Sequence, residues 1–429
     1  MAVSWLSRLA ARAPVPVFIA RGMHGDEAVH HLALAPGVQP VDSPRHAAVL
    51  LVAGGVPPEL QQALRRVHDQ LPAPFTTLWY RSEPLMELNR PDVSRVDSLS
   101  ELIPALTDTY RKLLRREAGD SSRLLPDEPP NPWQGRGDNG HGGEGMMGGV
   151  PYGRPMAMPP TMDLRDGLAL DILTFRLGPF FPLLPAGLGA EVSLQGDIVQ
   201  AFSIQSRPFP QLLAPAFFAT SIPIDRLELE RARHHLQALF PALHLAGLTD
   251  LALDALRLAA SCDAKDAKGI AALEKRFRTF ERRLRGRGFF ALHLPNRGVL
   301  STEQAKRIGG FVVRAVGIGQ DARSDDPEYR RLGFVPITHR GGDTQARWRQ
   351  RLAEVAQSLA LAGRASIADP RTDCLETPYG VLWDQSREDA STLLEALLPG
   401  LEWDQALATI ASLELAAVSP WPTREKDAA

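Results

Sequence analysis

The chain of 429 residues contains only two cysteines, Cys262 and Cys374, which lie 112 positions apart. A Cys-ligated iron–sulfur cluster or a structural zinc site needs three or four thiolates, usually from one chain. Two isolated thiols cannot supply such a set. The scarcity of cysteine therefore excludes a thiolate-bound metal centre held by this chain alone, and we expect both residues to be small buried hydrophobes.

The sequence also lacks long apolar runs and an excess of charge of one sign. No run of 18 or more apolar residues is present, so no segment is expected to span a bilayer. The formal net charge is −2, which gives no global attraction to nucleic acid or to an anionic membrane. The first residues show no long apolar core followed by a cleavage site, so we expect a cytosolic location.

Strand and helix patterns alternate over the first quarter of the chain. The strands are expected at 14–20, 46–55 and 75–81, and the helices at 58–71 and 99–116. Such alternation predicts a small parallel sheet with helices on its faces. A site in a sheet of this kind lies at the carboxyl ends of the strands.

The segment 119–165 is dense in glycine and proline and holds five of the eight methionines, which predicts an irregular connector. Its Gly140-x-Gly142-x-x-Gly145 pattern matches the dinucleotide fingerprint only formally, because no strand precedes it and no helix follows. One hypothesis is that the connector crosses a cleft between two domains and that its methionines fill irregular gaps.

Residues 166–429 are predicted to form an α+β region. A β-meander is expected over 170–205 and a late hairpin over 364–385. The expected helices cover 226–260, 264–287, 301–316, 343–363 and 403–415.

The stretch "FIARGMHGDEAVHHL" (18–32) looks like a strand that runs into a polar loop with His24, Asp26, Glu27, His30 and His31. Imidazole and carboxylate groups suit zinc, so His24 and His30 are candidate metal ligands. The alternative is a solvated polar loop. Because adjacent His30 and His31 would face different directions on a helix or strand, the solvated loop is the favoured interpretation.

The segment 264–287 carries nine Lys or Arg residues against three acidic residues, with apolar positions at helical spacing. It is interpreted first as a core helix with a basic outer face. The other interpretation is a docking face for an acidic partner or for lipid headgroups at the membrane edge.

The stretch "VDSPRHAAVLLVAGGVPPELQQALRRVHDQLPAP" (41–74) resembles the cluster-bearing small subunit of respiratory complex I (20 kDa-like) and of energy-converting [NiFe] hydrogenases. The resemblance implies a flavodoxin-like α/β domain over 1–118. In that family four cysteines hold a [4Fe–4S] cluster. The positions that correspond to them lie in loops that here carry no cysteine but Met23, His24, Asp26, Arg81, Ser82 and Ser98.

Four ordered segments resemble the partner large subunit, which is the hydrogenase large chain or the 49 kDa-like subunit of complex I. They are "GIGQDARSDDPEYRRLGF", "GDTQARWRQRLAEVAQSL", "ETPYGVLW" and "LATIASLELAAVSP". The resemblance implies a hydrogenase-large-subunit-like domain over 166–429, built from a β-meander and a helix bundle. The Cys-x-x-Cys pairs of the hydrogenases are missing. The loop that matches the quinone-site loop of complex I carries Phe180, Phe181 and Pro185, and no histidine.

The first of these four segments also carries the charged residues Asp321, Arg323, Asp325 and Asp326. In the relatives this loop lies near the buried active-site cavity, where charge is thought to couple chemistry to the membrane subunits. A structural ion-pair network and a proton-coupling path are both open interpretations.

The resemblance implies a fusion of degenerate small- and large-subunit-like domains. Without thiolates we expect no cofactor and no redox catalysis, and we expect no nucleic-acid partner. The expected role is a peripheral subunit on the cytoplasmic face of a bacterial inner membrane, with antiporter-like and channel-forming membrane proteins as partners. Two alternatives stay open: a subunit that still takes part in quinone or electron chemistry with clusters on other chains, and a metal-binding scaffold that uses the histidine loop.

Overall fold

A computed structural model describes residues 12–88, 94–117, 119–126, 172–218, 220–264, 266–292, 295–373, 376–381, 389–413, 415 and 418–419. The predicted connector over 119–165 lies outside the described residues except for 119–126, and so does Cys374. We refer to 12–126 as the N-terminal region and to 172–419 as the C-terminal region.

The N-terminal region is built on a five-stranded, fully parallel sheet with strand order β2-β1-β3-β4-β5. The strands are β1 (Val15–Arg21), β2 (Val38–Pro40), β3 (Val49–Ala53), β4 (Thr76–Tyr80) and β5 (Ser94–Val96). All five residues of β3 are buried, as the continuous apolar run predicts for a strand covered on both faces. The order is that of an open doubly wound sheet whose switch point lies between β1 and β3.

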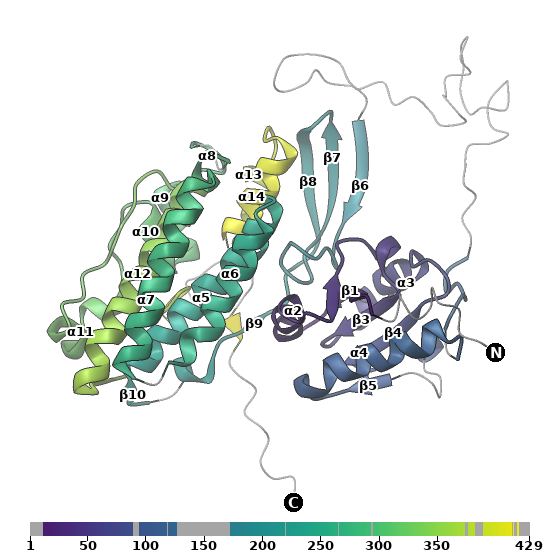
Figure 1. Ribbon diagram of the computed structural model, residues 1–429. Helices are drawn as coiled ribbons and strands as arrows, with labels where there is room; N and C mark the ends of the chain where they lie inside the picture. The colour runs from purple at the N-terminus through teal and green to yellow at the C-terminus, as the bar shows by residue number, and fades with distance from the viewer. Residues whose placement is uncertain are drawn as a thin grey trace, which may run out of the picture.

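Helices cover both faces of this sheet (Figure 1). The cluster on one face includes residues of α2 (Asp26–Ala33) and α4 (Leu99–Leu114), whereas the cluster on the other includes residues of α3 (Gln61–Asp69). The prediction of a parallel α/β sheet is therefore confirmed. The more specific flavodoxin-like assignment stays a prediction.

The C-terminal region begins with an antiparallel three-stranded meander, which projects above the parallel sheet in Figure 1. Its strands are β6 (Ile172–Leu177), β7 (Gly189–Gln195) and β8 (Ile198–Ser206). The meander packs on α10 (Gly310–Ala315), α13 (Leu394–Leu397) and α14 (Trp403–Leu413) through one apolar cluster.

Four long helices form the second core: α5 (Ile224–Leu245), α6 (Thr249–Ala260), α7 (Ala267–Gly286) and α12 (Thr344–Ala368). Helix α12 packs against both α5 and α7. Three shorter helices lie around them: α8 (Phe289–Leu292), α9 (Thr302–Ile308) and α11 (Pro327–Arg331). Three short pairs of strands complete the region: β10 (Ile222–Pro223) with β11 (Arg371–Thr372), β12 (Glu376–Thr377) with β13 (Gly380–Val381), and β9 (Gln211–Leu212) with β14 (Val418–Ser419). Among the described residues no helix is long and apolar enough to cross a membrane.

Several predicted boundaries are wrong. The helix expected over 226–260 is two helices, because Gly247 adopts φ +71° between α5 and α6. The helix over 301–316 is likewise divided at Gly309, with φ +82°. The hairpin expected from 364 starts later, because α12 continues to Ala368 and only β12 and β13 pair locally. The polar loop after β1 is short, and its two adjacent histidines lie on helix α2.

The two regions are joined by direct contacts. Phe180, from the loop after β6, is 4% exposed and packs in the same apolar cluster as β3, β4 and α3. Arg21 at the end of β1 donates a hydrogen bond to the carbonyl oxygen of Leu184. A further contact joins α5 to the segment after β2, where His244 Nε2 lies 3.4 Å from Asp42 Oδ2.

Candidate functional site

Main-chain hydrogen bonds join the loops at the carboxyl edge of the parallel sheet. The amide of Met23 donates to the carbonyl of Gly55 at 2.8 Å, and the amide of Gly55 donates back at 3.1 Å. A Cβ atom on Gly25 would lie 2.1 Å from the carbonyl oxygen of Ala53, and one on Gly54 would lie 2.0 Å from that of Met23. Glycine is therefore required at both positions, which fixes the conformation of the loop that carries Met23 and His24.

Arg81 ties together the three loops in which the sequence resemblance predicts degenerate cluster-binding positions. It follows β4, and its Nη1 lies 3.0 Å from Glu27 Oε2 at the start of α2. Its Nε donates to the main-chain carbonyl of Asp97, directly before Ser98, at 2.9 Å. Ser82 is buried beside it. The structure thus brings the predicted positions together at one edge of the sheet.

The residues at this edge do not fit a [4Fe–4S] cluster. Such clusters are held by thiolates, and the side chains here are a thioether, an imidazole, a carboxylate, a guanidinium and two hydroxyls. The Arg81 guanidinium has no lone pair to offer a metal. Within the described ranges, no group of three or more His, Cys, Asp or Glu side chains is arranged to hold a metal ion, so His24 and His30 are not assembled into a ligand set.

A cleft of about 120 Å³ opens at the same edge, between the N-terminal region and helix α5. Its apolar walls come from the loop 182–186 and from Phe209, Phe240 and Leu415. The polar groups that line it are Arg21, His24, Asp26, His30, His234, Gln237 and Arg351. The crevice beyond the carboxyl ends of the strands is therefore the largely apolar, sparsely polar kind of site that accepts small molecules.

His30 is the most perturbed group in the wall of this cleft. Burial lowers the pKa of His30 to about 4, with Asp26 acting in the opposite direction and Arg21 adding to the decrease. Its ring meets that of Phe240 edge to face, with centroids 6.2 Å apart. Burial also lowers the pKa of His24. Neutral imidazoles in an apolar cleft can donate or accept hydrogen bonds, so they suit a neutral polar group of a ligand.

The three residues of the predicted quinone-loop segment have separate positions. Phe180 is buried in the core of the N-terminal region, and Phe181 packs on the meander cluster. Pro185 lines the cleft. The loop therefore contributes apolar surface and the main-chain carbonyl that Arg21 binds, and only Pro185 of the three faces the cleft.

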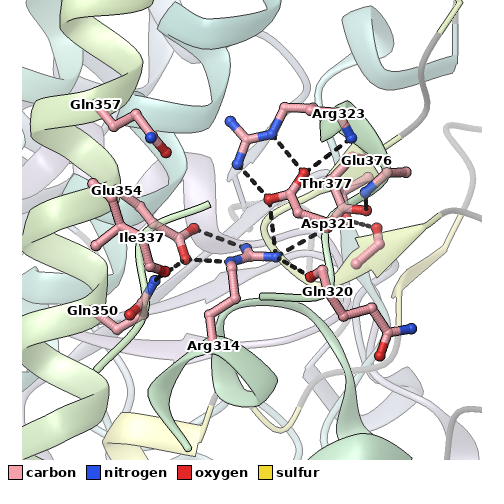
Figure 2. Close-up of polar contacts among 12 residues, drawn as sticks. Arg314, Gln320, Asp321, Arg323, Ile337, Gln350, Glu354, Gln357, Glu376 and Thr377 are labelled. Carbon is pink, nitrogen blue, oxygen red and sulfur yellow. Dashed lines mark hydrogen bonds and ion pairs between the residues drawn. The ribbon is translucent and has the colours of Figure 1, made fainter. Parts of the chain in front are cut away.

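A buried ion network joins α10, α12, β12 and the loop 320–323 (Figure 2). Arg314 on α10 is at its centre. Its Nε donates to Glu354 Oε1 at 2.7 Å and its Nη2 to Glu354 Oε2 at 3.0 Å, a bidentate pair. Its Nη1 lies 3.2 Å from both Asp321 Oδ2 and Glu376 Oε1.

A second arginine extends the network toward α5. Arg323 donates to Asp321 from Nε at 2.9 Å and from Nη2 at 2.7 Å, and its Nη1 lies 3.2 Å from Glu228 Oε1. The Tyr329 hydroxyl donates to the same Glu228 oxygen at 2.6 Å. Arg231, one turn along α5, lies 3.4 Å from Glu228 and donates to the main-chain carbonyl of Glu376.

His235 connects this network to the cleft wall. Its Nε2 lies 3.1 Å from Glu354 Oε2, and its Nδ1 lies 3.4 Å from Nη1 of Arg351, which lines the cleft. Because an arginine can only donate, Nδ1 must accept, which places the His235 proton on Nε2 facing Glu354. The neighbouring His234 ring lies 6.2 Å away and faces the cleft.

The carboxyl groups of the network differ in their readiness to take up a proton. Burial alone would raise the pKa of Glu354, but Arg314 and the hydrogen bond from His235 outweigh it and hold that pKa well below its usual value. For Glu376, burial and the nearby Asp321 charge outweigh the attraction of Arg314 and raise the pKa. Glu376 is therefore the acid in this network best suited to gain a proton.

The four charges predicted from the sequence divide into two pairs. Asp321 and Arg323 belong to the buried network. Asp325 is 92% exposed and its Oδ1 lies 3.5 Å from Arg330 Nη2. Asp326 caps α11, where it accepts from the amides of Glu328 and Tyr329.

Sequence reasoning did not single out Arg314, Glu354, Glu376, Glu228 and Arg231 for the network. A signal was present on α5 and α12, where charged residues recur at spacings of three and four within helices that are otherwise apolar on that face: Glu228, Arg231 and His235, then Arg347, Arg351 and Glu354. A buried charge is held only if it is paired, so such stripes predict partners facing one another.

Comparison with known families gives a match over part of the chain. Residues 257–398 match the model of the 49 kDa subunit of respiratory-chain NADH dehydrogenase. This span contains Arg314, Asp321, Arg323, Glu354 and Glu376, while α5 precedes it. The C-terminal region therefore carries a complex I 49 kDa-like segment, as the resemblance predicted, and the match does not include the N-terminal sheet. No curated protein matches the chain.

Among solved structures, a chain from the membrane-bound sulfane sulfur reductase, an archaeal respiratory membrane complex, is similar at 16% identity with a TM-score of 0.45. The similarity covers 57% of this chain and 96% of that one. At this identity and score the likeness is too weak to specify a fold or a function.

Proposed function

We propose that the chain is a redox-inactive peripheral subunit of a complex I-like membrane assembly, which fuses small-subunit-like and large-subunit-like domains and docks on ion-translocating, antiporter-like membrane subunits. The proposal rests on a contrast between the 49 kDa-like segment and the edge of the N-terminal sheet. The 49 kDa-like segment supplies five members of a closed, fully buried ion network, whereas the edge of the sheet expected to hold a cluster offers no thiolate.

The network has the properties of a coupling element. Arg314 links three acids, and one of them, Glu376, has a raised pKa, so a change of charge at the cleft or at a partner can be answered by proton uptake. His235 and Arg351 lead from the cleft wall to Glu354. A buried network of this kind also serves the fold, so the coupling role needs a functional test.

Co-purification tests the proposal most directly. The tagged full-length chain is isolated from native membranes, its partners are identified by mass spectrometry, and the iron content of the chain is measured. We expect antiporter-like membrane subunits and no iron bound by this chain. An EPR-visible cluster on the chain in stoichiometric amount, or purification without membrane partners, would contradict the proposal.

Ion movement tests the coupling role in the same assembly. Glu376→Gln keeps the shape of the side chain but cannot titrate, so we expect assembly to persist and ion transport in vesicles to fall. Asp325→Asn, a change at the exposed acid of the neighbouring loop, is the matched control. Equal transport by both variants would leave the network with a structural role only.

A second candidate function is participation in quinone or electron chemistry with clusters on other chains. The cleft favours it, because its apolar walls and neutral histidines could receive an uncharged ring with polar substituents. Binding of a short-chain quinone to the purified chain, lost on Gln237→Leu and retained on the exposed Gln70→Leu, would support this alternative.

A further inference from the structure

Helix α7 belongs to the bundle, where α6 lies between it and the N-terminal sheet in Figure 1. Its apolar residues, Ile270, Leu273, Phe277, Phe280 and Leu284, are all buried against the bundle. Its cations therefore point outward. Residues 267–287 hold eight Lys and Arg against two Glu, although the whole chain has a net charge of −2.

Part of this charge is neutralised within the protein. Arg278 pairs with Glu274 and Arg285 with Glu281 along the helix. Arg283 pairs with two acids of α6. Within the described residues, Lys275, Arg276 and Arg282 have no carboxylate at ion-pair distance: Arg276 donates to Ser261 Oγ at 2.9 Å and Arg282 to Thr279 Oγ1 at 3.2 Å. These three cations remain available to an external anion.

Two of these cations, Lys275 and Arg276, border a groove between α6 and α7 with a volume of about 310 Å³. Its charged lining is Arg257, Lys275, Arg276 and Arg283 with a single acid, Asp254, which already pairs with two of the arginines. The Thr279 hydroxyl already donates to the main-chain carbonyl of Lys275, and Leu258 and Phe280 form an apolar floor. The groove thus combines an excess of hydrogen-bond donors for an anionic group with a patch for apolar atoms.

We infer that the α6–α7 face binds the headgroups of anionic phospholipids and thereby holds this part of the chain at the membrane surface. The face lacks the apolar anchors that a protein interface uses, since none of the large hydrophobic side chains that are exposed in the described residues lies on α6 or α7. Separate, flexible cations along a 20-residue helix instead match a fluid anionic surface, which needs no fixed shape.

Vesicle binding tests this inference with the purified full-length chain. We expect co-sedimentation with vesicles of phosphatidylcholine and phosphatidylglycerol, weaker binding as salt rises, and no binding to phosphatidylcholine alone. Lys275→Glu with Arg276→Glu should lower the affinity at least about tenfold, because each cation near a lipid surface contributes about 1 kcal/mol. Both side chains are exposed, so the variant is expected to keep the thermal unfolding of the wild type.

The matched control reverses two exposed cations spaced along a helix of the N-terminal region, Arg111→Glu with Arg115→Glu, and should bind like the wild type. Equal loss in both double variants, unchanged binding of the α7 variant, or absence of wild-type binding would overturn the inference. Inorganic phosphate that competes with the vesicles would indicate a site for free phosphate and would also count against a lipid surface. These vesicles contain no protein, so the result is independent of the co-purification test.

Discussion

At the scale of one residue, His30 shows how the position of a side chain in the fold changes its pKa. On a solvated loop, as the sequence favoured, it would titrate near 6.5. On α2 it faces the cleft between two regions, and burial lowers its pKa to about 4. Between these pH values the unfolded chain binds a proton that the folded chain does not, so the free energy of unfolding must fall as the pH falls.

Replacing His30 by glutamine should therefore reduce the acid sensitivity of the fold. We expect the free energy of unfolding to depend less on pH between about 6.5 and 4, by up to about 1.4 kcal/mol per pH unit. Urea unfolding at a series of pH values measures this slope. His31→Gln, the adjacent change on the same helix, is the control. A His30→Gln slope equal to that of the wild type would show that His30 titrates as an exposed histidine does.

Glu354 provides the second residue-scale prediction. Its carboxylate accepts bonds from Arg314 and Gln350 and lies 3.1 Å from His235 Nε2, while its own side chain is 1% exposed. Glu354→Gln removes the charge and leaves Arg314 buried with less compensation, which should cost about 3–5 kcal/mol of unfolding free energy. Asp325→Asn, at an exposed acid, should change stability by less than about 0.5 kcal/mol. Chemical denaturation of both variants distinguishes a buried network from a set of surface pairs.

At the scale of elements, the loop between β1 and α2 depends on the absence of side chains. The carbonyl oxygen that a Cβ atom on Gly25 would meet belongs to β3, which is buried on both faces and cannot move aside. We expect Gly25→Ala to lower stability by about 1–3 kcal/mol through overpacking. Gly37→Ala is the matched control, because no atom lies within 4 Å of its added Cβ. Thermal unfolding compares them, and equal melting temperatures would mean that the loop can open.

The elements also show what the sequence could and could not predict. The apolar run of β3 and the helical periodicity of α3, α4, α7 and α12 are local signals, and these elements were predicted correctly. Helix α2 and the three-residue strands β2 and β5 were missed, because so few residues carry no reliable period. Asp321 and Arg323 could be singled out by resemblance, but the other acids of the network, Glu228, Glu354 and Glu376, come from distant segments, and only the fold brings these together.

For the whole molecule, the arrangement of the two regions is set by a few contacts around the cleft. Phe180 belongs in sequence to the C-terminal region but packs in the core of the N-terminal sheet. Phe181 packs within its own region. These neighbouring aromatic residues therefore provide a matched pair, one that joins the two regions and one that does not.

Phe180→Ala should weaken the connection between the regions more than it weakens either one. The lost apolar burial and the remaining cavity are expected to cost about 3–5 kcal/mol. Because this loss falls on the contact between regions, we expect calorimetry to show one unfolding transition for the wild type and two for the variant. Phe181→Ala should lower the melting temperature and retain a single transition. If Phe180→Ala also unfolds in one step, the Arg21–Leu184 and Asp42–His244 contacts are sufficient to keep the cleft walls together.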